Sequence, residues 1–315
     1  MHVAICIVGF RNPHDIVECL AALDRSTYAR FEVVICENGG AEAFAALTRT
    51  VPGKLPGGQS VRVVDAHGNL GYAGGINLCM AAAPAADAWW VLNPDTVPDS
   101  AALAHLCARL EKGACAAVGS TIHDAGGRVE SRGGRWNAWL ARAVSVDNGL
   151  RLGDPPGAIA STEQLNYLSG ASMLVGRAFV ERVGVMREDY FLYAEEVEWC
   201  LRGVQAGLKL GLAADANVLH QQGTSTGSVH DVRRRGRMPV YLDERNKILV
   251  TRDRYPRRLL IASGASFILL FLRFARRGAW AQLGYGLSGW LAGMRDERGP
   301  PPWLNAGRGA AVSGE

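Results

Sequence analysis

Short apolar runs alternate with segments of helical spacing through the first hundred residues. The runs are rich in Val and Ile, as expected of strands buried on both faces of a parallel sheet, and they lie at residues 2–8, 31–38, 61–67 and 88–93. After the first run, Asn12-Pro13 is typical of a helix start, and Val17, Leu20 and Leu23 follow at three-residue spacing. This βαβ alternation predicts a doubly wound, mostly parallel α/β sheet, in which ligands bind beyond the carboxyl ends of the strands.

The pattern changes after the first hundred residues. Residues 120–170 contain paired Gly and Pro residues and predict a loop-rich region that shapes a substrate pocket. From Glu195 onward, apolar residues recur at the spacing of an amphipathic helix, with Glu195, Glu196 and Glu198 in its first turn. At 100° per residue, Glu195 is expected to face solvent, while Glu196 and Glu198 flank the apolar stripe. Glu198 can also pair with Arg202 one turn later.

Charge is distributed unevenly along the 315 residues. The chain carries a formal charge of +4, but residues 231–315 hold 16 Lys and Arg against 7 Asp and Glu, so the remainder is acidic. We therefore divide the chain into residues 1–230 and a basic, helical C-terminal extension, residues 231–315. Within the extension, the uncharged run 259–272 is flanked by arginines. At 14 residues it is short for a membrane-spanning helix, and it predicts either a core helix or one that lies in a membrane interface.

Composition excludes several classes of protein. A content of 48% hydrophobic and 20% charged residues is not that of a disordered chain. Seven scattered cysteines without a CxxC pair argue against a disulfide framework or a structural zinc site, and the apolar start suits a strand better than a secretory signal. We expect a cytoplasmic protein, peripheral on the membrane if the extension binds lipid. The basic end lacks a nucleic-acid reading module, so no nucleic-acid partner is expected.

Three segments carry candidate chemistry. Asn93 and Asp95 follow the fourth apolar run, where oxygen ligands could hold a divalent cation, although Asn-Pro-Asp also forms simple turns. The glycine-rich segment 68–78 permits close backbone approach to a ligand, or it is merely a turn into a helix of small residues. His220 follows another strand-like run and is either a metal ligand or a structural histidine.

Taken in order, these segments resemble the family 2 glycosyltransferases of the GT-A fold, particularly the bacterial rhamnosyltransferase-like branch. The resemblance spans roughly residues 3–250 and is carried by GFRN after the first strand, VVICENGG, GNLGYAGGINL, NPDT, YFLYAEEVEWCLR, VLHQQG and YLDERNKILV. The ordered set is far more specific than any one of its members.

The resemblance implies an inverting, metal-dependent transferase that moves a sugar, with rhamnose as one candidate, from a nucleoside diphosphate donor to an acceptor hydroxyl. Asp95 is the implied ligand of Mg²⁺ or Mn²⁺, and His220 is at the position where some relatives have a histidine at the metal. Glu195-Glu196 matches the family's acidic dipeptide, and Glu196 is the implied general base. Residues 1–230 would form the nucleotide-sugar-binding and catalytic domain.

The implied donor-binding residues follow the predicted strands or lie in the glycine-rich segment: Gly9, Arg11, Glu37, Asn38, Asn69, Gly71, Gly75, Asn77 and Asn93. Two departures from the family pattern stand out, because Glu37 and Glu196 both replace an aspartate that the family more often has. The implied acceptor is a glycan or a lipid-linked sugar, in the synthesis of cell-surface polysaccharide or glycolipid. A homo-oligomer is left open.

Two other functions are compatible with parts of this pattern. A sugar-nucleotide pyrophosphorylase would also be α/β, but it should carry a glycine-rich, basic phosphate loop after the first strand, where this chain has GFRNP. A noncatalytic nucleotide-sugar-binding or scaffold protein could have kept the fold, and the Glu-for-Asp changes would suit such a loss of activity.

Overall fold

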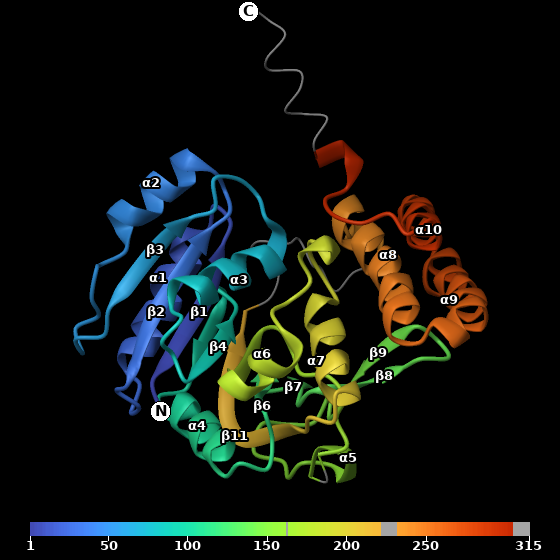
Figure 1. Ribbon diagram of the computed structural model, residues 1–315. Coiled ribbons are helices and arrows are strands. Elements are labelled where there is room, and N and C mark those ends of the chain that lie inside the picture. The colour runs from blue at the N-terminus through green and yellow to red at the C-terminus, as the bar shows by residue number, and fades with distance from the viewer. Residues whose placement is uncertain (162, 222–231, 305–315) are drawn as a thin grey trace, which may run out of the picture.

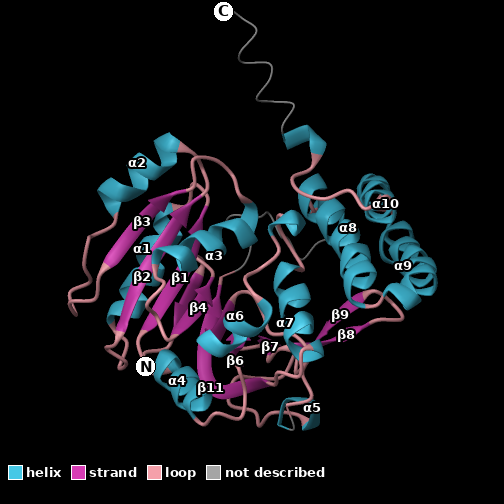
Figure 2. Ribbon diagram, in the orientation of Figure 1, coloured by secondary structure: helices cyan, strands magenta, loops and turns pink. Residues whose placement is uncertain are grey.

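The computed structural model describes residues 1–161, 163–221 and 232–304. Within these ranges a nine-stranded sheet has the order β3-β2-β1-β4-β10-β6-β11-β5, with β7 paired to β6 (Figures 1 and 2). A separate hairpin is formed by β8 and β9. The strands are β1 Val3–Gly9, β2 Phe31–Glu37, β3 Val61–Asp65, β4 Ala88–Leu92, β5 Thr96–Pro98, β6 Ala117–His123, β7 Val129–Ser131, β8 Gly134–Asn137, β9 Arg142–Ser145, β10 Ser172–Gly176 and β11 Leu210–His220.

The helices fall into an N-terminal and a C-terminal group. Those before β11 are α1 Pro13–Asp24, α2 Ala41–Thr50, α3 Gly71–Ala82, α4 Ala102–Glu111, α5 Ala158–Ser161, α6 Arg177–Val183 and α7 Glu195–Gln205, with a 3₁₀ turn, η1, at Glu188–Tyr190. Those after it are η2 Val232–Arg234, α8 Arg237–Arg254, η3 Pro256–Arg258, α9 Leu259–Phe274, η4 Ala275–Arg277 and α10 Trp280–Met294.

The four strands predicted from the first hundred residues are confirmed as β1 to β4, all parallel to one another. The sheet is mixed beyond them because β10 runs antiparallel to both β4 and β6. The strands are apolar on both faces because helices cover both. Val3, Ile5 and Ile7 of β1 share a core with α1 and α4, whereas Ala4 and Cys6 share one with α3, α7 and α8.

Helix α1 begins at Pro13 as predicted, although Asn12 makes no side-chain capping bond to it. The Asn12 Oδ1 instead accepts a hydrogen bond from the Phe10 backbone N–H at 2.9 Å. Its buried face includes Leu20 and Leu23, as expected, but Val17 is 41% exposed. Residues spaced three apart turn gradually away from one face of a helix, so Val17 lies outside the buried face. Ile16, Cys19, Leu20 and Leu23, at positions i, i+3, i+4 and i+7, make the contact with the core instead.

Residues 120–170 contain more regular structure than their composition predicts. They hold the end of β6, strand β7, the β8–β9 hairpin and the short helix α5. These strands have only three or four residues, too few to show a clear alternation in the sequence. The first of them, β7, adds a residue to the site described below.

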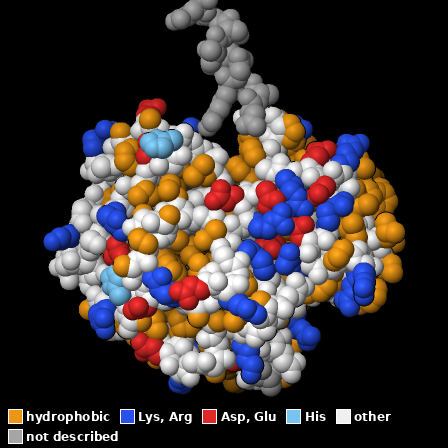
Figure 3. Space-filling model, viewed as in Figure 1, with side chains coloured by type: hydrophobic (Ala, Val, Ile, Leu, Met, Phe, Trp, Pro, Cys, Tyr) orange, Lys and Arg blue, Asp and Glu red, His pale blue; other side chains and the backbone are white. Residues whose placement is uncertain are grey.

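Helices α8, α9 and α10 lie on the side of the molecule opposite α1 and α2 (Figure 1). The uncharged run 259–272 lies within one continuous helical segment, Pro256–Arg277, of 22 residues. This segment is, in the described part of the chain, the one helix with the length and composition to cross a membrane, and only 28% of its most apolar window is buried. The segment Pro256–Arg277 is therefore not a core helix. Hydrophobic side chains gather along the right-hand edge of the molecular surface, where α9 and α10 lie (Figure 3). The boundary proposed at residues 230 and 231 lies outside the described residues.

Candidate active site

A cleft of about 580 Å³ opens at the carboxyl ends of the parallel strands β1, β2 and β4. This is the edge where α/β sheets bind ligands. Its walls come from segments far apart in the sequence: the ends of β1, β2 and β11, the start of α3, the segments after β4 and before β10, the loop and first turn of α7, the start of α8, and Leu304. Its polar and charged lining residues are Asn38, Asn69, Tyr72, Asn93, Asp95, Ser169, Tyr193, Glu195, Glu196, His220 and Arg235.

Asp95 and His220 come together at one wall of this cleft. Asp95 follows β4, and His220 ends β11, which pairs antiparallel with β5 so that His220 lies opposite Thr96. The His220 Nε2 is 3.4 Å from the Asp95 Oδ1 and 3.4 Å from the Asn93 Nδ2. Three residues that the sequence singled out as candidate cation or donor contacts are therefore neighbours.

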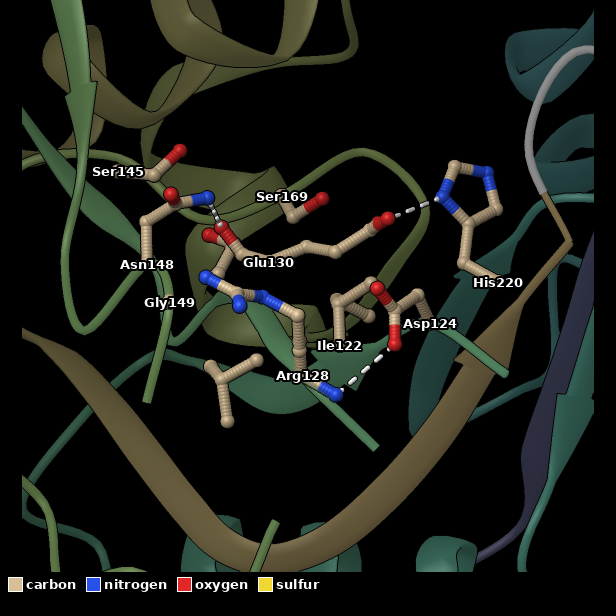
Figure 4. A pocket seen from close by; sticks show the side chains of 11 residues that line it. Ile122, Asp124, Arg128, Glu130, Ser145, Asn148, Gly149, Ser169 and His220 are labelled. Atoms are coloured by element: carbon tan, nitrogen blue, oxygen red, sulfur yellow. Dashed lines mark hydrogen bonds and ion pairs between the residues drawn. The ribbon is translucent and has the colours of Figure 1, made fainter. Parts of the chain in front are cut away.

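Glu130 of β7 completes this group, and no pattern in the sequence indicates it. Its Oε2 lies 3.3 Å from the His220 Nδ1 (Figure 4), whereas Asp95 approaches the other ring nitrogen, Nε2. The carboxylate also borders a second, polar cavity of about 410 Å³, which Arg128 and Asn148 line as well. Burial lowers the pKa of His220, but the hydrogen bonds to Asp95 and Glu130 outweigh it and raise that pKa to about 9.

The donor set suits a divalent cation that also binds phosphate. Mg²⁺ is typically held by one or two carboxylates together with substrate phosphates and water, and Mn²⁺ accepts imidazole as well. A cation bound at Nε2 would displace the proton there, and the Nδ1–H bonded to Glu130 would then hold the ring in the usual arrangement of a ligating histidine. Among the described residues, no three His, Cys, Asp or Glu side chains are placed to hold one metal ion together. Glu130 and Asp95 contact different ring nitrogens of His220. Asp95 and His220 thus fit a site that a bound diphosphate would complete.

Glu195 and Glu196 begin α7 and also line the cleft. The expectation that Glu195 faces solvent is wrong, because it is 2% exposed, while Glu196 is half-buried. The helical projection failed because it orients a side chain only relative to the helix's own apolar stripe, whereas Glu195, the first residue of α7, is buried in the wall of the cleft. Burial, together with the neighbouring Glu196, raises the pKa of Glu195 well above its ordinary value, and burial also raises the pKa of Glu196.

The third acid of this turn, Glu198, is engaged elsewhere. Its carboxylate pairs with Arg202 at 3.2 Å, as predicted, and with Arg254 of α8 at 3.4 Å. The Glu195 Oε2, in contrast, is buried and has no hydrogen-bond partner among the residues described. Of the three carboxylates, Glu195 and Glu196 are thus the ones positioned to act in the cleft.

The loop that leads into α7 is strained and is held by α8. Phe191, Tyr193 and Ala194 all have φ between 66° and 73°, a conformation unfavourable for residues with side chains. The Asn246 Nδ2 donates to the backbone carbonyls of Tyr190, Leu192 and Tyr193 at 3.0, 2.8 and 2.7 Å.

Arg245 adds to this support, because its guanidinium donates to the same Tyr190 carbonyl at 2.9 Å and to the Asn246 Oδ1 at 2.8 Å. Both side chains are essentially buried. The sequence of residues 241–250, YLDERNKILV, does not indicate this role, because a helical pattern does not show which loop the polar side chains will contact. Arg245 and Asn246 are positioning residues for the acidic pair.

The same loop fixes the start of α3. The Tyr72 backbone N–H donates to the Phe191 carbonyl at 2.7 Å, and a Cβ on Gly71 would lie 2.1 Å from that oxygen. With φ at +75°, Gly71 is a position that requires glycine. The Tyr72 hydroxyl donates to the Gly170 carbonyl at 2.7 Å across the cleft.

Four of the predicted donor-binding residues line the cleft: Asn38, Asn69, Gly71 and Asn93. Asn38 is 3% exposed, and its Nδ2 donates to the Gly71 carbonyl at 2.8 Å, so it ties the end of β2 to the start of α3. The Asn69 Oδ1 accepts from the Gly71 backbone N–H at 3.0 Å. Whether these side chains also contact a donor stays a prediction.

The other five predicted donor-binding residues do not line this cleft. The Glu37 Oε1 accepts the backbone N–H groups of Arg11 and Gly39 at 3.0 and 2.7 Å, and the Arg11 side chain donates to the Gly39 carbonyl. Gly9 packs against the Glu37 side chain, leaving no room for a Cβ. Glu37 therefore joins the loops after β1 and β2.

Gly75 and Asn77 have packing roles within the fold. Gly75 lets α3 approach Val8 of β1, where an added Cβ would be 2.7 Å from a methyl carbon. The Asn77 side chain binds the Met186 backbone on both its N–H and its carbonyl, and it also donates to the Glu188 carboxylate. These contacts hold the segment that precedes the strained loop.

Comparison with known proteins identifies the family of the chain. A family model described as "Glycosyltransferase like family 2" matches residues 2–238. An N-acetylglucosaminyl-diphospho-decaprenol L-rhamnosyltransferase of Mycobacterium tuberculosis is 28% identical over 238 residues, which cover 69% of this chain and 74% of the relative. A low-salt glycan biosynthesis hexosyltransferase of Haloferax volcanii is 23% identical over 194 residues, covering 61% of this chain and 60% of the relative.

The fold is that of GT-A glycosyltransferases. The structure of a mannosyltransferase from Pyrobaculum calidifontis in complex with GDP-Man and Mn²⁺ matches with a TM-score of 0.55 at 15% sequence identity. The match covers 94% of this chain and 88% of that one. The predicted fold class is thereby confirmed.

We expect Asn246→Ala to destabilise the protein by about 3 kcal/mol, because it removes buried donors from three carbonyls of a strained loop. Chemical denaturation measures this directly. Asn217→Ala serves as the matched control, since the Asn217 amide binds Asp99 at an exposed site and its loss should cost less than about 0.5 kcal/mol. Equal effects of the two substitutions would contradict a special role for Asn246.

Glu130→Gln should lower the pKa of His220, because it removes one of the two carboxylates that favour the imidazolium. An NMR titration of the His220 ring in the absence of added divalent cations tests this. Asp124→Asn is the control, since Asp124 borders the same polar cavity and bonds to backbone N–H groups instead of to His220. An unchanged titration of His220 in Glu130→Gln would rule out the proposed contact.

Proposed function

This chain belongs to glycosyltransferase family 2, and we propose that it is an inverting, metal-dependent enzyme that transfers a sugar from a nucleoside diphosphate donor to an acceptor hydroxyl. One observation carries the proposal: Asp95 with His220 and Glu195 with Glu196 line the same cleft at the carboxyl edge of the sheet. A site for diphosphate and a candidate base thus face one shared space, as a direct displacement requires.

The donor diphosphate is proposed to lie against Asp95 and His220. A divalent cation, Mg²⁺ or Mn²⁺, held there would neutralise the diphosphate as it leaves. The protein's own contribution is to fix the two ligands, Asp95 at the end of β4 and His220 at the end of β11, with Glu130 orienting the imidazole. The Pyrobaculum mannosyltransferase, which was solved with GDP-Man and Mn²⁺, supports this assignment by analogy.

Glu196 is proposed as the general base. It takes the proton of the acceptor hydroxyl while the acceptor oxygen bonds to the anomeric carbon and the bond from that carbon to the diphosphate breaks. The nucleoside diphosphate leaves from the opposite face, so the anomeric configuration inverts. Glu196 is more accessible than Glu195, and the raised pKa of both carboxyls gives the base a greater affinity for the proton that it accepts.

The acceptor is proposed to be a lipid-linked or other cell-surface glycan, and the location cytoplasmic. The support is the Mycobacterium tuberculosis relative, whose name gives a diphospho-decaprenol acceptor and an L-rhamnosyl donor group. Rhamnose is accordingly the first donor sugar to test. A panel of nucleotide sugars with and without Mn²⁺, read by thermal shift and then by product formation, distinguishes a transferase from a protein that only binds the donor.

Asp95→Ala should abolish the metal-dependent part of donor binding and reduce transfer by about 100-fold or more. The measurements are the thermal shift by nucleoside diphosphate with Mn²⁺ and the transfer rate. Asp99→Ala, which removes an exposed carboxylate four residues later, is the control and should leave both unchanged. If donor binding by Asp95→Ala still depends on the metal, Asp95 is not a ligand of that metal.

Glu196→Gln should keep donor and metal affinity and lower kcat by about 10² to 10⁴-fold, because the amide retains the shape and loses the basicity. Since burial raises the pKa of Glu196, the acidic limb of the kcat profile should lie above the ordinary range of a glutamate and disappear in the variant. Glu181→Gln, at an exposed position of α6, is the isosteric control.

Glu195→Gln separates the two acids. Because the folded state raises the pKa of Glu195, stability is lost as the pH rises through that pKa. The variant should therefore gain more thermal stability at pH near 8 than at pH near 5, and retain more activity than Glu196→Gln. Loss of transfer in Glu195→Gln with near-normal transfer in Glu196→Gln would assign the base to Glu195.

A further inference from the structure

The outward faces of α9 and α10 form an apolar surface with no partner among the described residues. On α9 the side chains of Leu260, Ile261 and Ile268 are 81%, 60% and 61% exposed. On α10, Trp280 is 67% exposed and Leu291 44%. Isolated exposed apolar residues are ordinary on protein surfaces, but a contiguous set of this size marks a contact site.

The exposed residues of α9 occupy one side of the helix. At 100° per residue, positions 260, 261, 264, 267, 268, 271 and 272 fall within an arc of about 140°. The buried positions lie on the opposite side and pack toward α8 and α10: Ala262, Ser263, Ser266, Leu270 and Phe274. The packing of α9 is therefore complete on its inner side, and the apolar outer side needs another explanation.

Basic residues lie at both ends of this surface. From residue 255 to residue 294 the chain has five arginines and no Asp or Glu. Arg257 is exposed at one end of the helical segment, and Arg276 and Arg277 are exposed at the other. Beside the first end, the Arg258 guanidinium lies 4.5 Å from the ring centre of Trp139, which is 51% exposed. An apolar stripe bordered by Arg and Trp has the composition of a helix that lies in a lipid interface.

We propose that the α9–α10 face docks on the surface of an anionic lipid bilayer, with α9 lying in the plane of the membrane. Like charges at both ends disfavour a second copy of the chain, because parallel and antiparallel pairing would each bring arginines together. Crossing the bilayer is also disfavoured, since α9 packs against α8, whose buried Glu244 and Arg245 would have to follow it into the hydrocarbon.

Residues 233–235 link this face to the cleft. The Arg233 Nε donates to the Arg277 carbonyl at 2.6 Å, and the Gln282 side chain of α10 donates to the carbonyls of Arg233 and Arg235 at 2.7 and 3.2 Å. Arg235 lines the cleft. If the proposed function holds, the docked enzyme would present its cleft to an acceptor carried in the same membrane.

Flotation of the full chain with vesicles tests the docking. The vesicles are phosphatidylcholine alone or phosphatidylcholine with about one third phosphatidylglycerol, at low salt and at about 0.5 M salt. We expect the protein to float with the anionic vesicles at low salt and much less at high salt or without anionic lipid. Protein that stays unbound on anionic vesicles at low salt overturns the proposal.

Two variants locate the contact. Leu260→Glu/Ile268→Glu should reduce the floated fraction about tenfold or more, and Arg257→Glu/Arg276→Glu should do the same. The controls carry the same charge changes elsewhere, Val17→Glu/Val185→Glu and Arg49→Glu/Lys54→Glu, at exposed positions far from α9 in the sequence. Equal losses in variants and controls would show nonspecific charge effects and contradict the proposal.

Donor binding separates this proposal from the proposed function. The thermal shift by nucleoside diphosphate with Mn²⁺ should be the same in all four variants, since none of the substituted residues lines the cleft. Loss of flotation with normal donor binding supports docking. A dimer in light scattering that Leu260→Glu/Ile268→Glu dissociates, together with no vesicle binding, assigns the face to a second copy and overturns the lipid proposal.

Discussion

The structure of the candidate site depends on a few buried hydrogen bonds between α8 and a strained loop. Asn246 and Arg245 donate to carbonyls of residues 190–193, and these bonds offset the cost of positive φ at Phe191, Tyr193 and Ala194. By holding this loop, they help to fix the direction in which α7 begins, and so the position of Glu195 and Glu196. The Phe191 carbonyl of the same loop also accepts a hydrogen bond from the Tyr72 backbone N–H at the start of α3. The bonds from α8 to this loop therefore help to position two walls of the cleft, the start of α7 and the start of α3.

Electrostatics explains why such support is needed. Glu195 is buried beside Glu196, its Oε2 lacks a hydrogen-bond partner in the described part of the chain, and burial is also the main cause of the raised pKa of Glu196. A carboxylate in that setting destabilises the fold, and relaxation of the loop would relieve it. Glu198, one turn into the same helix, shows the alternative, because Arg202 and Arg254 compensate its charge. Uncompensated acids in a cleft are typical of residues kept for chemistry rather than for stability.

The sequence predicted the parts of this structure that follow from local periodicity. The four parallel strands, the start of α1 at Pro13 and the helix from Glu195 are found where the pattern indicates them. What it could not predict depends on contacts between distant segments. Glu130 lies in a strand too short to show alternation, Asn246 reaches a loop more than fifty residues earlier, and Glu37 bonds to backbone N–H groups of two neighbouring loops. The burial of Glu195 was mispredicted because helix projection takes no account of the distant segments that form the cleft with the first turn of α7.

The boundary at residues 230 and 231 divides the sequence into two parts, but in the described structure segments from both parts share one hydrophobic core. Ile248, Leu249 and Val250 of α8 belong to the same hydrophobic core as Ala4 and Cys6 of β1. Helix α8 therefore supports the acidic pair on one side and carries α9 and α10 on the other. The same helix thus belongs to two packed groups, because Arg245 and Asn246 bond to the strained loop while Val240 packs with Leu270 of α9 and Leu283 of α10. Among the C-terminal helices, it is therefore α8 that links the outer helices to the segment that positions the site.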